Sequence, residues 1–267
     1  MERNSILSIV YCVMMTLLVL QGVGGALLSL NYIPVMEELQ ALKSVQSIGA
    51  TVKFGWFFQT LHKQCVHSIV IVSILLMILN IRKEEITVTT IAKWWGSVLT
   101  VLIILFAVYS GNILVGDGYA SQSYQIGGNI VNEIPLIGVM LHFLLFSSNQ
   151  QELQTFSLVR MYVNHILFLP ILLGTVLYLQ KPRELRENLT PIETIITILS
   201  VILVQITFAF LLPLNAKTIP YQPDWFFLPI HYLQQHIPSI ITGLIIGSLL
   251  LSVLFLPIIY RKKREGL

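Results

Sequence analysis

Charged residues are scarce in this chain of 267 residues: they make up 11%, whereas a soluble globular domain carries about 25%. Hydrophobic residues make up 55% of the chain, and the mean hydropathy is +0.79. These values exclude a soluble domain and predict an all-α integral membrane protein. The net charge of +3 does not indicate nucleic-acid binding, because the basic residues stand in short loops between apolar runs.

Cysteine is nearly absent too, since only Cys12 and Cys65 are present and both lie in apolar stretches. Two cysteines are too few for a disulfide framework, and the chain has no CxxC or CxxCH motif. No AxA-like cleavage site follows the first apolar run, which we interpret as a retained helix rather than a signal peptide. Nucleotide-binding loops, hydrolase elbows and zinc motifs are also missing from the sequence.

Six apolar segments are long enough to span a membrane, because about 20 residues of helix cross a hydrocarbon core roughly 30 Å thick. They are 6–32, 55–81, 94–115, 159–180, 192–213 and 238–260. A shorter apolar piece, 134–146, is too short to span and is expected at the interface or against the bundle. The fold class predicted is therefore a bundle of six transmembrane helices.

Lysine and arginine are concentrated on the side of the membrane that holds the N-terminus. If that side is the inside, 11 of the 16 Lys and Arg residues lie there. Cytoplasmic loops carry this excess of positive charge, so both termini are expected in the cytoplasm, with the chain in the inner or plasma membrane of the cell.

Two histidines occupy matching places in two of these segments. His62 lies about seven residues into the segment 55–81, and His165 about six residues into 159–180. Both segments run from outside to inside, so the imidazoles are expected at one depth, roughly 10 Å below the outer surface at 1.5 Å per residue. Two imidazoles so placed could hold one haem iron. The alternative is two unrelated intramembrane histidines, each hydrogen-bonded to a carbonyl, although such residues are usually functional.

Small and cationic residues near the same depth agree with a haem. Gly25 and Gly111 would let helices approach a flat porphyrin closely. Lys63 and Arg160 lie near the two histidines and the outer surface, where haem propionates would emerge. The alternative for the GVGG run that ends at Gly25 is plain packing between helices.

Several short motifs stand in a recognisable order along nearly the whole chain. They are Gln21 and Gly25; NYIP (31–34); SVQSI (44–48); FGW (54–56) and LH (61–62); Gly111; IPLIG (134–138); Arg160 with His165 and Pro170; and PDWFFLP (223–229). In these residues the chain resembles cytochrome b of the quinol:cytochrome c reductases, in particular the photosynthetic form, in which a four-helix cytochrome precedes a short partner subunit. The resemblance implies a four-helix haem bundle over residues 1–183 and a two-helix part over 184–267.

The family binds two haems stacked across the membrane, using a second histidine 14 or 15 residues after each first one. Those positions hold Leu76 and Gln180 here. Tyr11 and Ser97 stand where the family has the glycines of its inner haem site, and the haem-linking cysteine of the photosynthetic form is missing. The resemblance therefore implies a single, noncovalent haem b near the outer surface, with side chains filling the inner pocket.

The PDWFFLP motif resembles the Pro-Glu-Trp-Tyr motif of the family's outer quinol site. Asp224 replaces the glutamate, which accepts a proton from quinol, while Pro223, Trp225 and Phe226 would line the quinone. Phe226 lacks the hydroxyl of the family's tyrosine. A carboxylate at a low-dielectric surface can serve as a base near neutral pH. Asp224 could instead, or in addition, cap the short helix that follows.

The other four histidines give weaker indications of a functional site. His67 lies five residues after His62, on a different helix face, and is interpreted as a hydrogen-bonded helix residue. His142, His231 and His236 all lie on the outer side, where they could form a metal site that their spacing does not demand.

We therefore expect a subunit of a respiratory electron-transfer complex that binds one b-type haem and interacts with quinol at an outer site, rather than an enzyme acting alone. A Rieske iron–sulfur protein and a cytochrome c are the partners that the resemblance implies, and a homodimer is left open. The alternative is a haem-free or non-catalytic anchor or quinone-docking subunit. A six-helix transporter is disfavoured, because nothing indicates inverted repeats or helices broken at mid-membrane.

Overall fold

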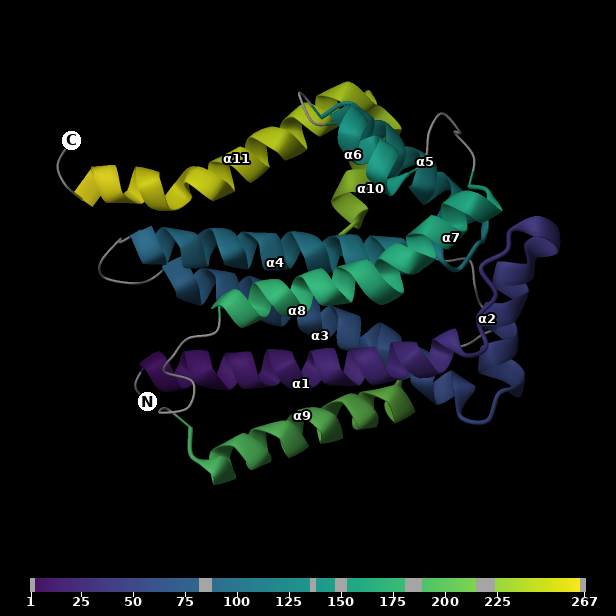
Figure 1. Cartoon of the computed structure of the whole chain (residues 1–267), viewed down its shortest axis with the longest axis horizontal. Coiled ribbons are helices and arrows are strands. Elements are labelled where there is room, and N and C mark those ends of the chain that lie inside the picture. Colours follow the sequence, from purple (N-terminus) through teal and green to yellow (C-terminus); the bar gives the residue numbers. More distant parts are fainter. Residues whose placement is uncertain are drawn as a thin grey trace.

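The computed structural model describes residues 3–81, 88–134, 138–146, 153–180, 189–214 and 224–264. Within these ranges every regular element is a helix, and the long helices run along the longest axis of the molecule (Figure 1). Six helices there are long and apolar enough to cross a membrane. The all-α fold class with six membrane-spanning helices is thereby confirmed.

The six spans have slightly different bounds from those predicted. They are α1 (Arg3–Ser29), α3 (Gly55–Ile81), α4 (Val88–Ile113), the continuous run of α7 (Thr155–Val163), η2 (Asn164–Phe168) and α8 (Leu169–Gln180), then α9 (Pro191–Leu211) and α11 (Ser239–Arg264). The third span begins six residues earlier than the apolar run, and the fourth begins four residues earlier. Polar residues can extend a helix beyond its apolar stretch, so composition alone does not mark these ends.

Helices α1, α3, α4 and α8 form a bundle that buries the main core. Met14, Leu17, Cys65 and Val70 are among its fully buried side chains. Helix α9 packs against α1 and α3, whereas α11 lies on the other side of the bundle, against α4 and α5 (Gly118–Asn132) (Figure 1). This arrangement places the histidine pair inside the bundle and the two last spans outside it.

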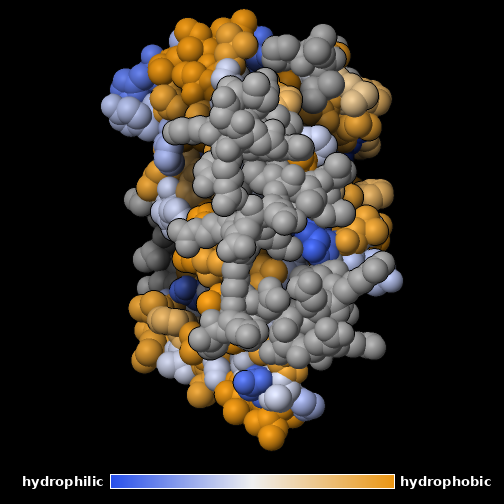
Figure 2. Space-filling view, turned by 90° about the vertical axis from the view of Figure 1, so that its left-hand side faces the viewer, coloured by the Kyte–Doolittle hydropathy of each residue, from blue (hydrophilic) through white to orange (hydrophobic). Residues whose placement is uncertain are grey.

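The outward faces of the bundle are apolar, as expected for surfaces that meet lipid. Large hydrophobic side chains are exposed along every span, for example Leu199 and Leu203 on α9 and Leu249 on α11. Figure 2 views the molecule from the left-hand end of Figure 1, and hydrophobic residues predominate around the rim where residues are coloured. The chain is therefore an integral membrane protein.

Both the start of α1 and the end of α11 lie at the left-hand end of the molecule in Figure 1. We call this the inner end and the opposite one the outer end, following the predicted orientation. Arg82, Lys83, Lys181, Arg183 and Arg186, on which much of that orientation rests, lie outside the described residues. The cytoplasmic location of the termini stays a prediction.

Shorter helices gather at the outer end. They are α2 (Gln40–Thr51), preceded by the short η1 (Glu37–Leu39), then α5, α6 (Gly138–Leu145) and α10 (Leu228–His236). Asp117 caps α5, because its Oδ1 accepts a hydrogen bond of 2.7 Å from the N–H of Ala120. The short apolar piece 134–146 supplies α6, which lies beside α5 (Figure 1). The described parts of the segment 116–157 are thus largely helical, and α5 lies between α11 and α4.

Hydrogen bonds attach the flanking helices to the bundle. On α9, the buried Gln205 accepts from Cys65 Sγ at 3.6 Å and donates to Ser68 Oγ at 2.9 Å, both on α3. On α11, Pro257 has no N–H to offer the carbonyl of Val253, four residues earlier. The indole Nε1 of Trp94 on α4 donates to that carbonyl at 2.9 Å. A hydrogen bond between helices therefore replaces the one that proline removes.

Candidate functional site

The two predicted ligand histidines lie side by side in the outer half of the bundle. The ring centroids of His62 on α3 and His165 in η2 are 6.1 Å apart, with an angle of 65° between the rings. Both side chains are partly accessible rather than fully buried. The separation is on the order of that between two imidazoles on opposite sides of one metal ion, since each metal–nitrogen bond is about 2 Å.

His165 lies in a widened helical turn. Between Asn164 and Phe168 the helix is of the π type, and the N–H of Leu169 bonds to the carbonyl of Asn164, five residues earlier. Pro170 follows directly and cannot donate to the carbonyl of Ile166. Single π-turns inside α-helices occur frequently at functional sites. This turn was not predicted from the sequence, although Pro170, which lacks an N–H, indicates an irregular helix at this point.

Each histidine has its Nδ1 atom against a backbone carbonyl of a neighbouring helix. His62 Nδ1 lies 3.2 Å from the oxygen of Gln21 on α1, and His165 Nδ1 lies 2.9 Å from the oxygen of Ala107 on α4. Ser110 Oγ also lies 3.1 Å from His165 Nδ1, but its hydroxyl donates to the Ala107 carbonyl at 2.9 Å. A carbonyl only accepts, so both Nδ1 atoms carry the hydrogen and both Nε2 atoms keep a lone pair. Metal-bound histidines almost always show this arrangement, which fixes the ring and its tautomer.

The lone pair of His62 already has a partner in this structure. The side-chain amide of Gln21 lies 3.1 Å from His62 Nε2, and Gln21 Nε2 is the donor because the imidazole nitrogen can only accept there. The other end of the same amide, Gln21 Oε1, is buried and unpartnered. An iron ligated by His62 would require this amide to turn aside.

The two predicted glycines lie directly against the two imidazoles. A Cβ atom on Gly25 would lie 3.0 Å from Cε1 of His62, and one on Gly111 would lie 2.8 Å from Cε1 of His165. Real Cβ atoms almost never come so close, so both rings depend on glycine for their positions. The donor nitrogens, their carbonyl partners and these glycines together fit a haem held between α3 and the η2 turn.

The two cations predicted near the haem propionates have protein partners. Arg160 Nη1 donates to the carbonyl of Phe143 at 2.6 Å, and its guanidinium lies 5.2 Å from the ring centre of Phe156. Lys63 Nζ lies 2.7 Å from Asp224 Oδ1 and 3.4 Å from Asn112 Oδ1. The structure thus joins Lys63 to the carboxylate that the sequence analysis assigned to the quinol site.

Asp224 is buried, with 6% of its surface exposed. Its Oδ2 accepts a hydrogen bond of 2.9 Å from Asn112 Nδ2, and its Oδ1 lies 4.0 Å from Nε2 of His67. Helix α10 has Phe227 at its N-cap position and no side-chain cap. The Asp224 carboxylate therefore faces the bundle instead of capping α10. Asn112 and His67 were missed as its neighbours, because such contacts between distant segments leave no local pattern.

The aromatic residues of the same motif surround Asp224 unevenly. Phe226 and Phe227 pack against the core of the bundle, whereas 51% of Trp225 is exposed. The ring of Phe226 lies 6.1 Å from that of His67. Pro223, the remaining predicted quinone-binding residue, lies outside the described residues.

The three outer histidines do not come together. His142 stacks on Phe146, and His236 Nδ1 donates to the carbonyl of Tyr232 at 2.9 Å. His231 Nε2 lies 2.9 Å from the hydroxyl of Tyr119, and burial lowers the pKa of His231. In the part of the chain that the structure describes, no three His, Cys, Asp or Glu side chains form a group that could hold a metal ion.

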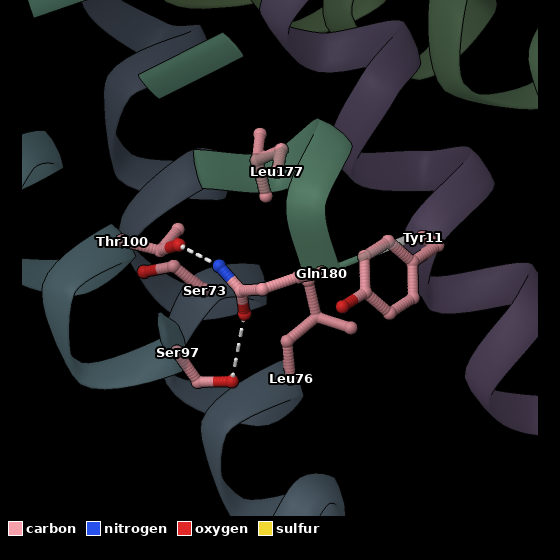
Figure 3. A pocket seen from close by; sticks show the side chains of 7 residues that line it. All are labelled: Tyr11, Ser73, Leu76, Ser97, Thr100, Leu177 and Gln180. Carbon is pink, nitrogen blue, oxygen red and sulfur yellow. Dashed lines mark hydrogen bonds between the residues drawn. The ribbon is translucent and has the colours of Figure 1, made fainter. Parts of the chain in front are cut away.

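The inner half of the bundle is filled by side chains at the places that correspond to the second haem site of the family. Figure 3 shows Gln180 between Ser97, from which its Oε1 accepts at 3.2 Å, and Thr100, to which its Nε2 donates at 2.9 Å. Tyr11 and Leu76 line the same place and are almost fully buried. The residues present do not fit a haem there.

Gln180 occupies its site in the same manner as His165 occupies the outer one. A Cβ atom on Gly96 would lie 2.7 Å from Cδ of Gln180, much as one on Gly111 would meet His165. Gly96 and Gly111 are fifteen residues apart, and so are His165 and Gln180. An amide thus packs on the inner glycine of α4 in the position that corresponds to an imidazole on the outer one.

Comparisons with known proteins agree with this geometry. The family model described as Cytochrome b/b6/petB matches residues 2–181. The chain is 24% identical to cytochrome b of Yarrowia lipolytica over 93% of this chain and 72% of that protein. It is 28% identical to cytochrome b6 of Mastigocladus laminosus over 64% of this chain and 80% of that protein.

A solved structure supports the fold independently. A chain of a hyperthermophilic respiratory Complex III superposes with a TM-score of 0.71 at 17% identity, covering 94% of this chain and 74% of that one. Identity this low shows the fold alone, whereas the family model covers more than half of the chain and confirms the resemblance found in the sequence. The chain belongs to the cytochrome b/b6 family.

Proposed function

We propose that this protein is a membrane subunit of a respiratory electron-transfer complex and binds one noncovalent haem b between His62 and His165. The observation that carries the proposal is the paired imidazoles, each with Nδ1 on a carbonyl of a neighbouring helix and each packed on a glycine. When bound, the haem would accept and pass on single electrons. Family membership supports a haem, and the structural likeness to a chain of a respiratory Complex III supports a place in a respiratory complex.

The residues around the pair would orient the haem. The Gln21 and Ala107 carbonyls hold both imidazoles with the lone pair on Nε2, and Gly25 and Gly111 keep the rings in place. Iron binding at His62 would require the Gln21 side-chain amide to leave Nε2. Arg160 and Lys63 are the proposed partners of the propionates. Lys63 would serve in this role while its ammonium group also holds Asp224.

Quinol is the proposed electron donor, at an outer site next to Asp224. In this proposal Asp224 accepts a quinol proton, and Pro223, Trp225 and Phe226 wall the quinone. The burial of the carboxylate beside apolar rings supports the assignment. A Rieske-type iron–sulfur protein and a cytochrome c are the proposed outer partners. Residues 1–183 would form the haem bundle, and residues 184–267 a part equivalent to the partner subunit of the photosynthetic form.

A second function, that of a haem-free anchor or quinone-docking subunit, has one observation in its favour. The Gln21 amide satisfies His62 Nε2 within the chain itself, so His62 is fully hydrogen-bonded without iron. In this case the cytochrome b fold would serve to hold other subunits, and Asp224 would stabilise the outer loop.

The haem content of the purified protein separates the two functions. We expect one pyridine haemochrome equivalent per chain, lost in His62→Ala and in His165→Ala, and retained in His142→Ala as the matched control. No haem in wild-type protein isolated folded and with its partners would contradict the redox proposal and support the anchor. Two haems per chain would show that the inner pocket opens for a cofactor despite Leu76 and Gln180.

A further inference from the structure

His67 lies beside the proposed quinol carboxylate. It follows His62 by five residues on α3, which turns it by more than a quarter of the helix circumference toward the segment that precedes α10. Its Nε2 lies 4.0 Å from Asp224 Oδ1, and its ring lies 6.1 Å from that of Phe226. Its side chain is 31% exposed, against 5% for Asp224. The imidazole is therefore more accessible than the carboxylate that it faces.

Both oxygens of Asp224 already accept from donors. Lys63 Nζ is 2.7 Å from Oδ1 and Asn112 Nδ2 is 2.9 Å from Oδ2. A proton that arrives at the carboxylate must displace one of these donors, and it removes the negative charge from the ion pair with Lys63. Removing one partner from a buried ion pair is strongly unfavourable. A neighbouring base that takes the proton from Asp224 would restore this ion pair.

His67 has the chemistry that such a base needs. Imidazole is the side chain whose ordinary pKa allows it to gain and lose a proton between about pH 5 and 8. Its Nδ1 is buried and has no hydrogen-bond partner among the described residues. The ring is thus not committed to a structural hydrogen bond through that nitrogen. Two charged groups interact electrostatically with His67, the Asp224 carboxylate and the Lys63 ammonium, and their charges have opposite signs.

We propose that His67 is a proton-relay residue that receives on Nε2 the proton that Asp224 takes from quinol. In this step the O–H bond of the Asp224 carboxyl group breaks and an N–H bond forms on His67. Asp224 returns to the carboxylate paired with Lys63, and the imidazolium then releases its proton toward the outer surface. Quinol loses two electrons and two protons in all. One electron leaves to a one-electron acceptor such as the b haem, and the other electron and the second proton leave to another acceptor such as an iron–sulfur centre. This inference rests on the proposed function.

The proposal predicts a definite pH dependence. Only neutral imidazole can accept a proton, so quinol oxidation should speed up as the pH rises through the range in which His67 loses its proton. A histidine with a purely structural role in α3 would not produce this rise. Replacement by a side chain that cannot titrate should therefore slow the reaction and also flatten its pH profile.

The test uses the full-length chain with its associated subunits in lipid nanodiscs and a synthetic quinol, duroquinol, as the electron donor. The rate of haem b reduction is followed by stopped flow from about pH 5 to 8 for wild type, His67→Asn and His67→Gln. We expect both variants to be at least about tenfold slower at the upper end, with the rise lost. His142→Asn, which changes an outer histidine away from Asp224, should match wild type. Haem content and reduction by dithionite, measured for each, report whether the fold is intact.

A second readout does not depend on turnover. Infrared difference spectra after quinol addition should show the band of a protonated carboxyl group accumulating in His67→Asn, and this band should be absent from His67→Asn/Asp224→Asn. In wild type the proton would have moved on, so the band should be weak. Imidazole added to His67→Ala should restore part of the rate if it occupies the space that the His67 ring leaves.

The outcomes are distinguishable from those of the proposed function. A wild-type protein that carries haem but is not reduced by duroquinol overturns the proposed quinol function and this inference with it. If wild type is reduced, then a rate that does not vary with pH overturns the inference alone, without any variant. The same conclusion follows if haem-replete His67→Asn and His67→Gln keep both the rate and the pH profile of wild type.

Discussion

Lys63 and Asp224, separated by most of the chain, form an ion pair in which Nζ lies 2.7 Å from Oδ1. Their side chains are only 19% and 5% exposed. Asn112 on α4 contacts both members, so three segments meet at this point. The pair fixes the segment before α10 on the four-helix bundle, next to the histidine pair.

Removing one member of this pair should cost more stability than removing both. Lys63→Met leaves the buried Asp224 without its counter-charge and should lower the free energy of unfolding by about 3 kcal/mol. Lys63→Met/Asp224→Asn should recover most of that loss, because no unpaired charge remains. Thermal unfolding in detergent, followed by intrinsic fluorescence, gives the comparison, with Lys53→Met as an outer-surface control. A double variant no more stable than Lys63→Met would show that the pair does not act as a unit.

Haem occupancy should depend on the absence of a side chain at Gly111. The Cβ of Gly111→Ala would lie 2.8 Å from Cε1 of His165 and would displace the ring. Haem affinity should fall about tenfold, the range seen when the support of a ligating histidine is lost. Gly174→Ala on α8 is the matched control, since nothing lies within 4 Å of its Cβ position. Equal haem-to-protein ratios for the two variants would argue against ligation by His165.

The inner pocket should contribute to stability and not to haem binding. Gln180→Leu removes the hydrogen bonds to Ser97 and Thr100, whose hydroxyls keep backbone carbonyls as acceptors, and should cost about 0.5 to 1.5 kcal/mol. The haem-to-protein ratio should remain that of wild type. Thermal unfolding and pyridine haemochrome measured on the same preparations test both expectations. A fall in haem content without a change in unfolding temperature would instead connect this pocket to the cofactor.

The hydrogen bond from the Trp94 indole should contribute to stability because Pro257 leaves the Val253 carbonyl without a donor within α11. Trp94→Phe removes the donor to the Val253 carbonyl and should destabilise the packing of α11 by about 1 kcal/mol. In a Pro257→Ala background an N–H within the helix can take over that carbonyl, so the same substitution should cost less. A double-mutant cycle on thermal unfolding measures the difference. Additive effects would show that the proline and the indole are independent.

The free energy of unfolding should decline below neutral pH because His231 binds a proton more readily in the unfolded chain. Burial lowers the pKa of His231, so the unfolded chain binds its proton more readily than the folded chain does. The free energy of unfolding should therefore fall as the pH drops through the ordinary histidine pKa of about 6.5. His231→Gln should weaken this dependence between about pH 7 and 5. Unfolding temperatures of wild type and variant, measured across that pH range, test this prediction. If the unfolding temperature of the variant falls with pH as steeply as that of wild type, groups other than His231 cause the loss of stability.

The spans and the histidine pair could be predicted because their causes are local. A run of about 20 apolar residues has few alternatives to a membrane helix. His62 and His165 stand at similar distances from the starts of two such runs, so their common depth follows from helix geometry. Leu76 and Gln180 likewise marked the inner pocket, and the structure places both among the residues that line it.

What could not be predicted depends on contacts between distant segments. The partners of Asp224 come from α3 and α4, and no sequence pattern connects Lys63 or Asn112 to a residue so much later in the chain. The π-turn at His165 reflects both Pro170 and packing against α4. Helix α5 had a readable signal in Asp117, but its composition, with several glycines and polar residues, resembles that of a loop.

The filled inner pocket bears on how the membrane potential would act on the proposed reaction. Moving one elementary charge across a membrane costs about 2.3 kcal/mol for every 100 mV. With Gln180 and Tyr11 filling the inner pocket, this chain offers no haem site there to carry an electron inward. Quinol, Asp224 and the haem would all lie in the outer half, so electrons and protons that leave to the outer side would traverse only part of the field. Quinol oxidation at this subunit would accordingly proceed at nearly the same rate in energised and de-energised membranes.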